Sequence, residues 1–217
     1  MALNADLGAA DNFPTQIQEM DLWLRGEPLP EGHPFRPIHA HPMGPTSPEI
    51  WILGSSDYGA QLAAYLGYPY AYAYFFTEGR GTEEALALYR ANYRPSARFP
   101  AQKATICVWA LAADTEFEAR RLLMTREHWR VGFEKGLRTP LLSPEEAAAY
   151  PYSEAEHATI QRLREKAIVG SGAQVAARIR ELAAKFALDE IVVNTWTYDP
   201  AARHRSYELL AREFAMA

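Results

Sequence analysis

Cysteine is almost absent from this sequence, since Cys107 is the only one among 217 residues. No internal disulfide can therefore form, and a reducing compartment such as the cytoplasm is expected. Long apolar runs are missing too, because no stretch approaches the roughly 20 apolar residues that cross a bilayer. The first residues, Met1 to Asp6, show no basic region followed by an apolar one. We therefore expect neither a signal peptide nor a membrane partner.

Positive charge is also scarce. The chain has 22 Lys and Arg against 27 Asp and Glu, which gives a formal net charge of −5. Nucleic-acid surfaces need a cationic stripe that neutralises phosphates, so we expect no nucleic-acid partner. Hydrolase chemistry has little support, because the sequence shows no Ser-His-Asp order with a nucleophile elbow. His39 and His41 lie in a Pro-rich stretch without a nearby carboxylate, so no metal site is expected.

An alternation of strand and helix patterns dominates the rest of the sequence. Residues 1–48 comprise a short helix and then a connection, 26–48, with seven prolines and three glycines. Beyond it, four apolar runs predict strands, and helix patterns separate them. These runs are residues 50–53, 70–76, 104–111 and 191–196. Residues 130–168 contain two helix starts but no strand pattern, and we interpret them as an insertion.

Strands that alternate with helices predict an α/β fold with a parallel sheet and right-handed crossovers. A complete (β/α)₈ barrel needs eight strands and about 250 residues, twice the number of strands predicted here. The sheet is therefore either open or part of a barrel. Periodicity alone does not choose between these two architectures.

A short polar turn links the first predicted strand to its helix. Between Gly54 and Gly59, small residues allow the backbone to approach a ligand closely. The first N–H groups of the helix are unpaired and carry the positive end of its dipole. Ser55 and Ser56 add hydroxyl donors, whereas Asp57 is compatible with an anion only if its carboxylate points outward. The turn favours an anion, although a Ser or Asp N-cap without a ligand explains the same residues.

Two long stretches carry a resemblance to a known family. They are residues 48–69, PEIWILGSSDYGAQLAAYLGYP, and residues 189–210, DEIVVNTWTYDPAARHRSYELL. Residues 112–120 and the stretch from Val169 to Ser171 fall between them in the expected order. Together they resemble the luciferase-like flavin-dependent monooxygenases, in which the long stretches form the fifth and the last strand-helix units. The resemblance implies the C-terminal half of a (β/α)₈ TIM barrel, with about four parallel strands and the N-terminal half absent. Residues 1–217 would then form one incomplete luciferase-like domain.

The resemblance also implies a function and a cofactor. Members of the family bind a reduced flavin, usually FMN, and activate O₂, which implies a monooxygenase that acts on a small organic substrate. A flavin reductase is an implied partner, a deazaflavin is an alternative cofactor, and a homo-oligomer is expected. The implied cofactor contacts are Gly54, Ser55, Ser56, Asp57, Tyr58, Gly59 and Tyr74. Since the flavin supplies the difficult chemistry, no catalytic side chain can be named from the sequence.

The predicted role of Tyr74 depends on a strand direction. Tyr70, Tyr72 and Tyr74 share one face of the strand predicted at 70–76. In relatives the position of Tyr74 lies toward the flavin, near the carboxyl end of that strand. The alternative is that all three tyrosines pack under the outer helices.

A second interpretation keeps the fold but not the activity. The chain would be a truncated half-barrel that binds flavin weakly or only associates with partner chains. The open edges of a sheet with few strands favour such association.

Overall fold

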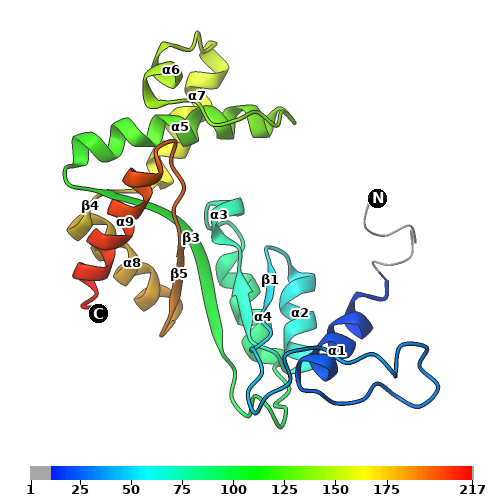
Figure 1. The fold of residues 1–217 in the computed structure, drawn as a ribbon. Helices are drawn as coiled ribbons and strands as arrows, with labels where there is room; N and C mark the ends of the chain where they lie inside the picture. Colours follow the sequence, from blue (N-terminus) through cyan, green and yellow to red (C-terminus); the bar gives the residue numbers. More distant parts are fainter. Residues whose placement is uncertain (1–10, 217) are drawn as a thin grey trace.

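The computed structural model describes residues 11–216, which form nine helices and five strands. The helices are α1 (Phe13–Leu24), α2 (Asp57–Leu66), α3 (Tyr74–Thr77), α4 (Thr82–Asn92), α5 (Glu116–Glu134), α6 (Pro144–Ala149), α7 (Glu154–Lys166), α8 (Gly172–Phe186) and α9 (Pro200–Glu213). The strands are β1 (Ile52–Gly54), β2 (Tyr70–Tyr72), β3 (Ala104–Ala113), β4 (Ile168–Ser171) and β5 (Ile191–Asn194). Figure 1 shows the long strand β3 in the middle, with α1 to α4, β1 and β2 on its right, β4, β5, α8 and α9 on its left, and α5 to α7 above.

All strand pairs in the sheet are parallel, as the alternation predicted. The strand β3 is the centre of the sheet, because Ile106 pairs with Tyr72 of β2 and with Ile191 of β5. Farther along β3, residues 110–113 pair with β4, and β1 pairs with β2. The carboxyl ends of all five strands therefore point toward one end of the sheet, which is the end where α/β proteins place their ligand sites.

One face of the sheet packs against helices. Along β3 every second side chain, Ile106, Val108 and Ala110, is fully buried in this core. Helices α2, α4, α8 and α9 supply the opposing apolar side chains, such as Leu86 and Val175. Apolar residues at every second position of a strand lie on one face of the sheet, and apolar residues spaced by three or four positions lie on one side of a helix. These two surfaces pack together and form the core between the sheet and the helices.

The other face of the sheet is covered only at its carboxyl end. There Trp109 and Leu111 pack against Leu122 of α5, the long helix that crosses the upper part of the molecule in Figure 1. Toward the amino ends, Leu53 of β1 is 56% exposed and Val192 of β5 is 42% exposed. This face is therefore partly open, with apolar side chains on it.

Two sequence predictions were wrong in detail. The predicted second strand ends at Tyr72, and Tyr74 begins the short helix α3. The Ala73 N–H still donates to the Gly54 carbonyl (2.9 Å), and the chain then turns into α3 despite the strand propensity of its aromatic residues. The strand β4 was missed because it has only four residues and contains Gly170. The segment 130–168 runs from within α5 to the start of β4 and contains α6 and α7, and its interpretation as an insertion stays a prediction.

Helix caps were predicted more accurately than strand ends. Ser143, Ser153 and Ser171 each form a complete capping box. Thr115 caps α5 through its hydroxyl. The first helix has Asn12 at its N-cap, without a side-chain cap hydrogen bond.

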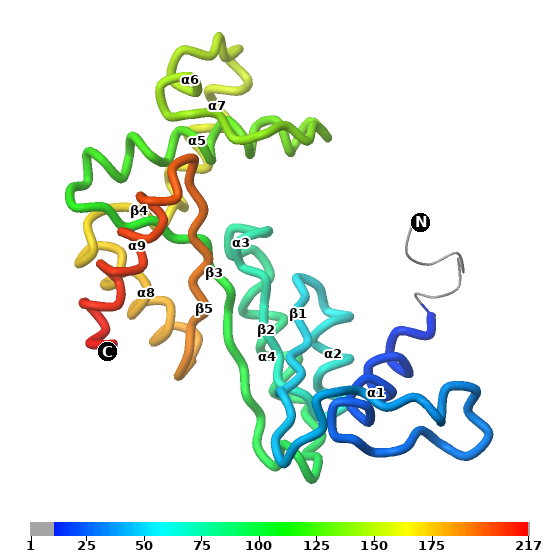
Figure 2. The backbone as a smooth tube through the Cα atoms, viewed as in Figure 1, coloured from blue at the N-terminus to red at the C-terminus, as the bar shows by residue number. Residues whose placement is uncertain are grey.

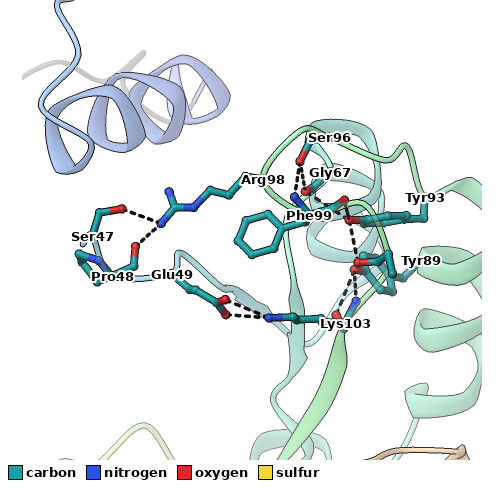
Figure 3. Close-up of polar contacts among 11 residues, drawn as sticks. Ser47, Pro48, Glu49, Gly67, Tyr89, Tyr93, Ser96, Arg98, Phe99 and Lys103 are labelled. Carbon is teal, nitrogen blue, oxygen red and sulfur yellow. Dashed lines mark hydrogen bonds and ion pairs between the residues drawn. The ribbon is translucent and has the colours of Figure 1, made fainter. Parts of the chain in front are cut away.

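The amino end of the sheet is held together by a polar network (Figure 3). Arg98 donates to the Pro48 carbonyl (2.6 Å) and the Ser47 hydroxyl (3.1 Å), and Lys103 pairs with Glu49 (2.9 Å). The Tyr89 hydroxyl lies 3.0 Å from the Lys103 carbonyl, and its phenol is fully buried. These contacts tie the Pro-rich connection, which forms a wide loop after α1 in Figure 2, to the loop before β3.

Candidate functional site

The turn between β1 and α2 is built from two glycines in close contact. A Cβ added at Gly59 would lie 3.4 Å from the Gly54 Cα and 3.7 Å from Cε2 of Tyr70. The Gly54 carbonyl accepts the Ala73 N–H, and the Tyr70 hydroxyl lies 3.4 Å from it. The first turn of α2 therefore rests directly on the end of β1, and its position is fixed by the neighbouring strand.

The amino terminus of α2 has donors without side-chain acceptors. Ser56 is the N-cap with extended backbone angles (φ −135°, ψ 165°), yet its side chain makes no cap hydrogen bond. By contrast, Ser143 accepts from the Glu146 N–H, and Ser153 accepts from the Glu156 N–H. The N–H groups at the start of a helix carry the positive end of its dipole and bind anions when no side chain occupies them. The start of α2 can therefore bind an anion.

The other predicted contacts on this turn are open to solvent. Ser55, Asp57 and Tyr58 are exposed, and the Tyr58 ring is 55% exposed. The Asp57 carboxylate lies in the first turn, where a negative charge also interacts favourably with the helix dipole. The structure thus brings Gly54, Ser55, Ser56, Asp57, Tyr58 and Gly59 together on one exposed strand-to-helix turn.

Tyr74 is not part of this turn. Its ring packs on Gly79, where an added Cβ would lie only 2.6 Å from the Tyr74 Cζ. Burial raises the pKa of the Tyr74 hydroxyl above its usual value. The side chain lines a small cavity between α3, β3, α5 and the start of β4, together with Trp109 and Arg126. The predicted strand position of Tyr74 is wrong, because Tyr74 begins α3, but its role as a cofactor contact stays a prediction.

That cavity adjoins an aromatic cluster that the sequence did not reveal. The rings of Trp109 and Trp196 are 5.9 Å apart in an edge-on arrangement, and those of Trp196 and Trp129 are 5.2 Å apart. Trp129 in turn stacks on Phe133 at 4.9 Å. These residues come from β3, the segment after β5, and α5, so no local sequence pattern could have joined them. They lie near the carboxyl end of the sheet, on the face that packs against α5.

A network of ion pairs, one of them buried, joins the helices at this end of the sheet. Glu78 after α3 accepts from Arg130 (3.0 Å) and Arg162 (3.0 Å), and both Glu78 and Arg130 have side chains only 9% exposed. Arg162 also pairs with Glu134 at 2.8 Å. These bridges connect α3, α5 and α7 across the end of the sheet.

Other titratable residues give no further site. His39 and His41 are exposed, and no group of three possible metal ligands occurs within residues 11–216. His128 is half-buried against Tyr150 and Tyr152, and burial lowers its pKa. Burial raises the pKa of the Cys107 thiol, which suits an inert side chain. No helix in this described part of the chain has the length and apolar content to cross a membrane.

Comparison with known proteins gives one consistent result. The chain is 34% identical over 202 residues to the uncharacterized protein YceB of Bacillus subtilis (strain 168), covering 93% of this chain and 60% of that protein. It is 34% identical over 210 residues to a luciferase-like monooxygenase of Escherichia coli (strain K12), covering 96% of this chain and 61% of that protein. The crystal structure of apo-MsnO8 superposes with a TM-score of 0.78 at 28% identity, covering 96% of this chain and 62% of that one.

The chain thus spans about 60% of the length of these curated relatives. The family model described as luciferase-like monooxygenase matches residues 19–189, which is most of the chain and includes both the turn at 54–59 and the aromatic cluster's Trp109 and Trp129. The resemblance inferred from the motifs is confirmed, and the chain belongs to the luciferase-like monooxygenase family.

Proposed function

We propose that this chain is the flavin-binding part of a monooxygenase that uses reduced FMN and O₂ to oxidise a small organic substrate. The observation that carries the proposal is the uncapped amino terminus of α2, which lies at the carboxyl end of a parallel sheet in a luciferase-like chain. A flavin phosphate is an anion of the kind that such a terminus binds.

The residues of the turn fit a phosphate. The N–H groups of Asp57, Tyr58 and Gly59 begin α2, and the hydroxyls of Ser55 and Ser56 are exposed beside them. The glycine contact keeps the helix start close to the strand, so the backbone itself forms the floor of the site. The Asp57 carboxylate would point away from the phosphate. When bound, the reduced flavin supplies the electrons for oxygen activation. The proposal includes a separate reductase that would deliver the reduced flavin. A deazaflavin in place of FMN is the alternative cofactor.

The chain's own groups would orient the ligand and exclude water from it. The aromatic cluster of Trp109, Trp196, Trp129 and Phe133 forms an apolar wall at the carboxyl end of the sheet. An apolar wall lowers the local dielectric constant and keeps water from a reactive centre. Its position suits the binding of an organic substrate beside a flavin.

The architecture is proposed to be part of a (β/α)₈ barrel. The strands β1, β4 and β5 each pair with only one other strand within the described residues, and Leu53 and Val192 are exposed on a face that the rest of a barrel would cover. The same exposure supports the second candidate function, a half-barrel that associates with partner chains without catalysis. Homo-oligomer formation also stays a proposal.

Flavin titration separates the two functions. FMN fluorescence should be quenched as protein is added, and riboflavin, which lacks the phosphate, should bind at least about tenfold more weakly because it loses the charge-assisted hydrogen bonds. An absence of quenching at high micromolar FMN would refute flavin binding by this chain. Equal affinities for FMN and riboflavin would refute the role of the turn while leaving flavin binding intact.

A further inference from the structure

A hollow with a volume of about 500 Å³ opens at the carboxyl end of the sheet, where α3 approaches the end of α5 (Figure 1). It is lined by Phe76, Arg80, Arg130, Phe133, Glu134 and Arg162. Sites of about 300–1,000 Å³ are typical of small organic ligands. The cavity beside Trp109 and Arg126, by contrast, has a volume of only about 20 Å³, room for one water molecule. The hollow therefore has room for an organic ligand, whereas that cavity does not.

The hollow has more positive charge than its acidic side chains neutralise. Arg130 and Arg162 share the Glu78 carboxylate, each at 3.0 Å, and Arg162 also pairs with Glu134 at 2.8 Å. The third arginine of the lining is Arg80, which forms no ion pair with any carboxylate of the described residues. Two carboxylates against three guanidinium groups leave one positive charge. This charge matches a ligand with a single negative charge.

Two of these arginines have donors without acceptors. The Nε of Arg80 donates to the Thr77 carbonyl (3.3 Å), which orients the side chain, and its two terminal amino groups have no acceptor between residues 11 and 216. The Arg130 side chain is only 9% exposed, and its Nε has no hydrogen-bond partner. Buried donors in proteins are nearly always paired, so these donors favour a ligand that supplies oxygen atoms.

Aromatic rings form the apolar side of the hollow. Phe76 is 52% exposed, and its ring lies 4.6 Å from that of Phe75. Phe133 stacks on Trp129 at 4.9 Å, so the hollow adjoins the aromatic cluster near the carboxyl end of the sheet. Aromatic pairs gain free energy beyond that of apolar burial alone. A ligand with a planar ring and an anionic group therefore matches both the exposed ring and the unneutralised charge.

We propose that this hollow binds an aromatic carboxylate, with the carboxylate on Arg80 and the ring against Phe76, and that such a molecule is the substrate. The two terminal amino groups of a guanidinium match the two oxygens of a carboxylate. The proposal rests on the proposed monooxygenase function, since it names the class of substrate, but its test requires no flavin. No residue of the turn at 54–59 lines the hollow, so substitutions there should leave the flavin-phosphate site intact.

The test compares three probes of similar size. Phenylpropanoate should bind to the wild-type chain and change its tryptophan fluorescence, because Trp129 stacks on Phe133 of the lining. Phenylpropanamide lacks the charge and should bind about three- to tenfold more weakly. Cyclohexylpropanoate keeps the charge but lacks the aromatic ring, and it should bind about threefold more weakly. Added KCl should weaken the binding of the two carboxylates only, since Arg80 is exposed.

Two substitutions separate the charge from the ring. In Arg80→Met the affinity for phenylpropanoate should fall to that of its amide, whereas Arg80→Lys should keep a preference for carboxylates. In Phe76→Ala the preference for phenylpropanoate over cyclohexylpropanoate should disappear, and the preference for charge should stay. Both side chains are exposed, so the Tm should change little. The matched control is Arg94→Met, which removes an exposed arginine that lies on the Tyr65 ring and outside the hollow, and it should bind like wild type.

Each other result overturns the proposal. No saturation by phenylpropanoate at millimolar concentration, or equal affinity for its amide, shows that the hollow does not select carboxylates. Binding that stays unchanged in Arg80→Met or in Phe76→Ala, with circular dichroism also unchanged, assigns the ligand to other residues. A Tm that falls steeply in both variants shows that the two side chains support the fold instead. If Arg80→Met weakens the binding of FMN but not of riboflavin, Arg80 contacts the flavin phosphate and not the substrate. Loss of flavin binding with intact, Arg80-dependent carboxylate binding would instead refute the proposed function alone.

Discussion

Replacement of Ser56 by aspartate should separate the stability of α2 from its capacity to bind phosphate. Aspartate is as good an N-cap as serine, and its charge interacts favourably with the helix dipole. In Ser56→Asp the new carboxylate can accept the N–H groups that Ser56 leaves without a side-chain acceptor in the present structure. The same N–H groups are the ones that a flavin phosphate would use, so the two anions compete for one place.

The substitution Ser56→Asp should raise the stability of the chain and lower its affinity for FMN. The dipole interaction contributes about 0.3–1 kcal/mol to stability, which for a chain of this size raises the Tm by roughly 1 to 4 °C. A carboxylate about 4 Å from a phosphate charge costs about 1 kcal/mol in water and about 4 kcal/mol at an effective dielectric constant of 20. Because Ser56 is exposed, the lower part of that range applies, and FMN affinity should fall by about tenfold.

The assay is a pair of titrations followed by thermal denaturation. FMN and riboflavin are each titrated into wild type, Ser56→Asp and Ser143→Asp, the last of which changes an equivalent capping serine on α6. FMN affinity should fall only in Ser56→Asp, and riboflavin affinity should be the same in all three proteins. An unchanged FMN affinity in Ser56→Asp, with an equal or higher Tm, would show that the phosphate does not bind at α2.

Three further predictions concern stability. The variant Tyr89→Phe lacks a fully buried hydroxyl that donates to backbone carbonyls. The free energy of unfolding measured in urea should therefore fall by about 1–3 kcal/mol, and the FMN affinity should stay unchanged. Gly79→Ala forces a Cβ against the Tyr74 ring at a φ of +87° and should lower the Tm by several degrees, whereas Gly136→Ala, at a φ of +78° with open space around it, should lower the Tm less. The Glu156 pKa is lowered from 4.5 to about 2, chiefly by Lys135 and by the cap of α7. The carboxylate therefore contributes to the free energy of unfolding above pH 4.5, and this contribution is lost as the pH falls toward about 2. The Tm of Glu156→Gln should therefore lie below wild type at pH 7, and the two values should converge in acid.

Each of these stability predictions can fail in a specific way. Equal urea midpoints for wild type and Tyr89→Phe would mean that the hydroxyl contributes nothing net to folding. Equal losses of Tm in the two glycine variants would assign the effect to backbone angles and not to the Tyr74 contact. A Tm difference between Glu156→Gln and wild type that stays constant from pH 7 to pH 3 would contradict the linkage argument.

The parts of the fold that follow from local patterns were predictable. Continuous apolar runs gave β1, β3 and β5, and the serine capping boxes marked the starts of α6, α7 and α8. The strand β4 was not predictable in this way, because its four residues gain their hydrogen bonds from residues 110–113 of β3, which are far away in the sequence. Local propensity has little influence on a strand that short.

The candidate site also has a part that local sequence predicted and parts that it did not. The turn at 54–59 was predictable because adjacent residues supply its glycines, hydroxyls and helix terminus. Tyr74 was placed in a strand, whereas β2 ends at Tyr72 and Tyr74 begins α3, and the local run of aromatic residues does not show where that strand ends. The cavity around Arg126 combines α3, β3, α5 and α7, so only the folded chain brings Trp109 next to an arginine of another element.

The two ends of the sheet satisfy their polar groups to different degrees, and this difference is the physical basis for assigning function to one of them. Near the amino end, Arg98, Lys103 and Tyr89 engage backbone carbonyls and carboxylates, so their contribution is to stability. At the carboxyl end, the start of α2 has no side-chain cap, and three of the four unpaired buried nitrogens of the described residues belong to Trp109, Arg126 and Arg130, the fourth being Trp23 Nε1 of α1. Unpaired buried donors lower stability unless water or a ligand supplies the missing acceptors. A ligand that accepts from the donors at the carboxyl end should therefore raise the Tm of this chain.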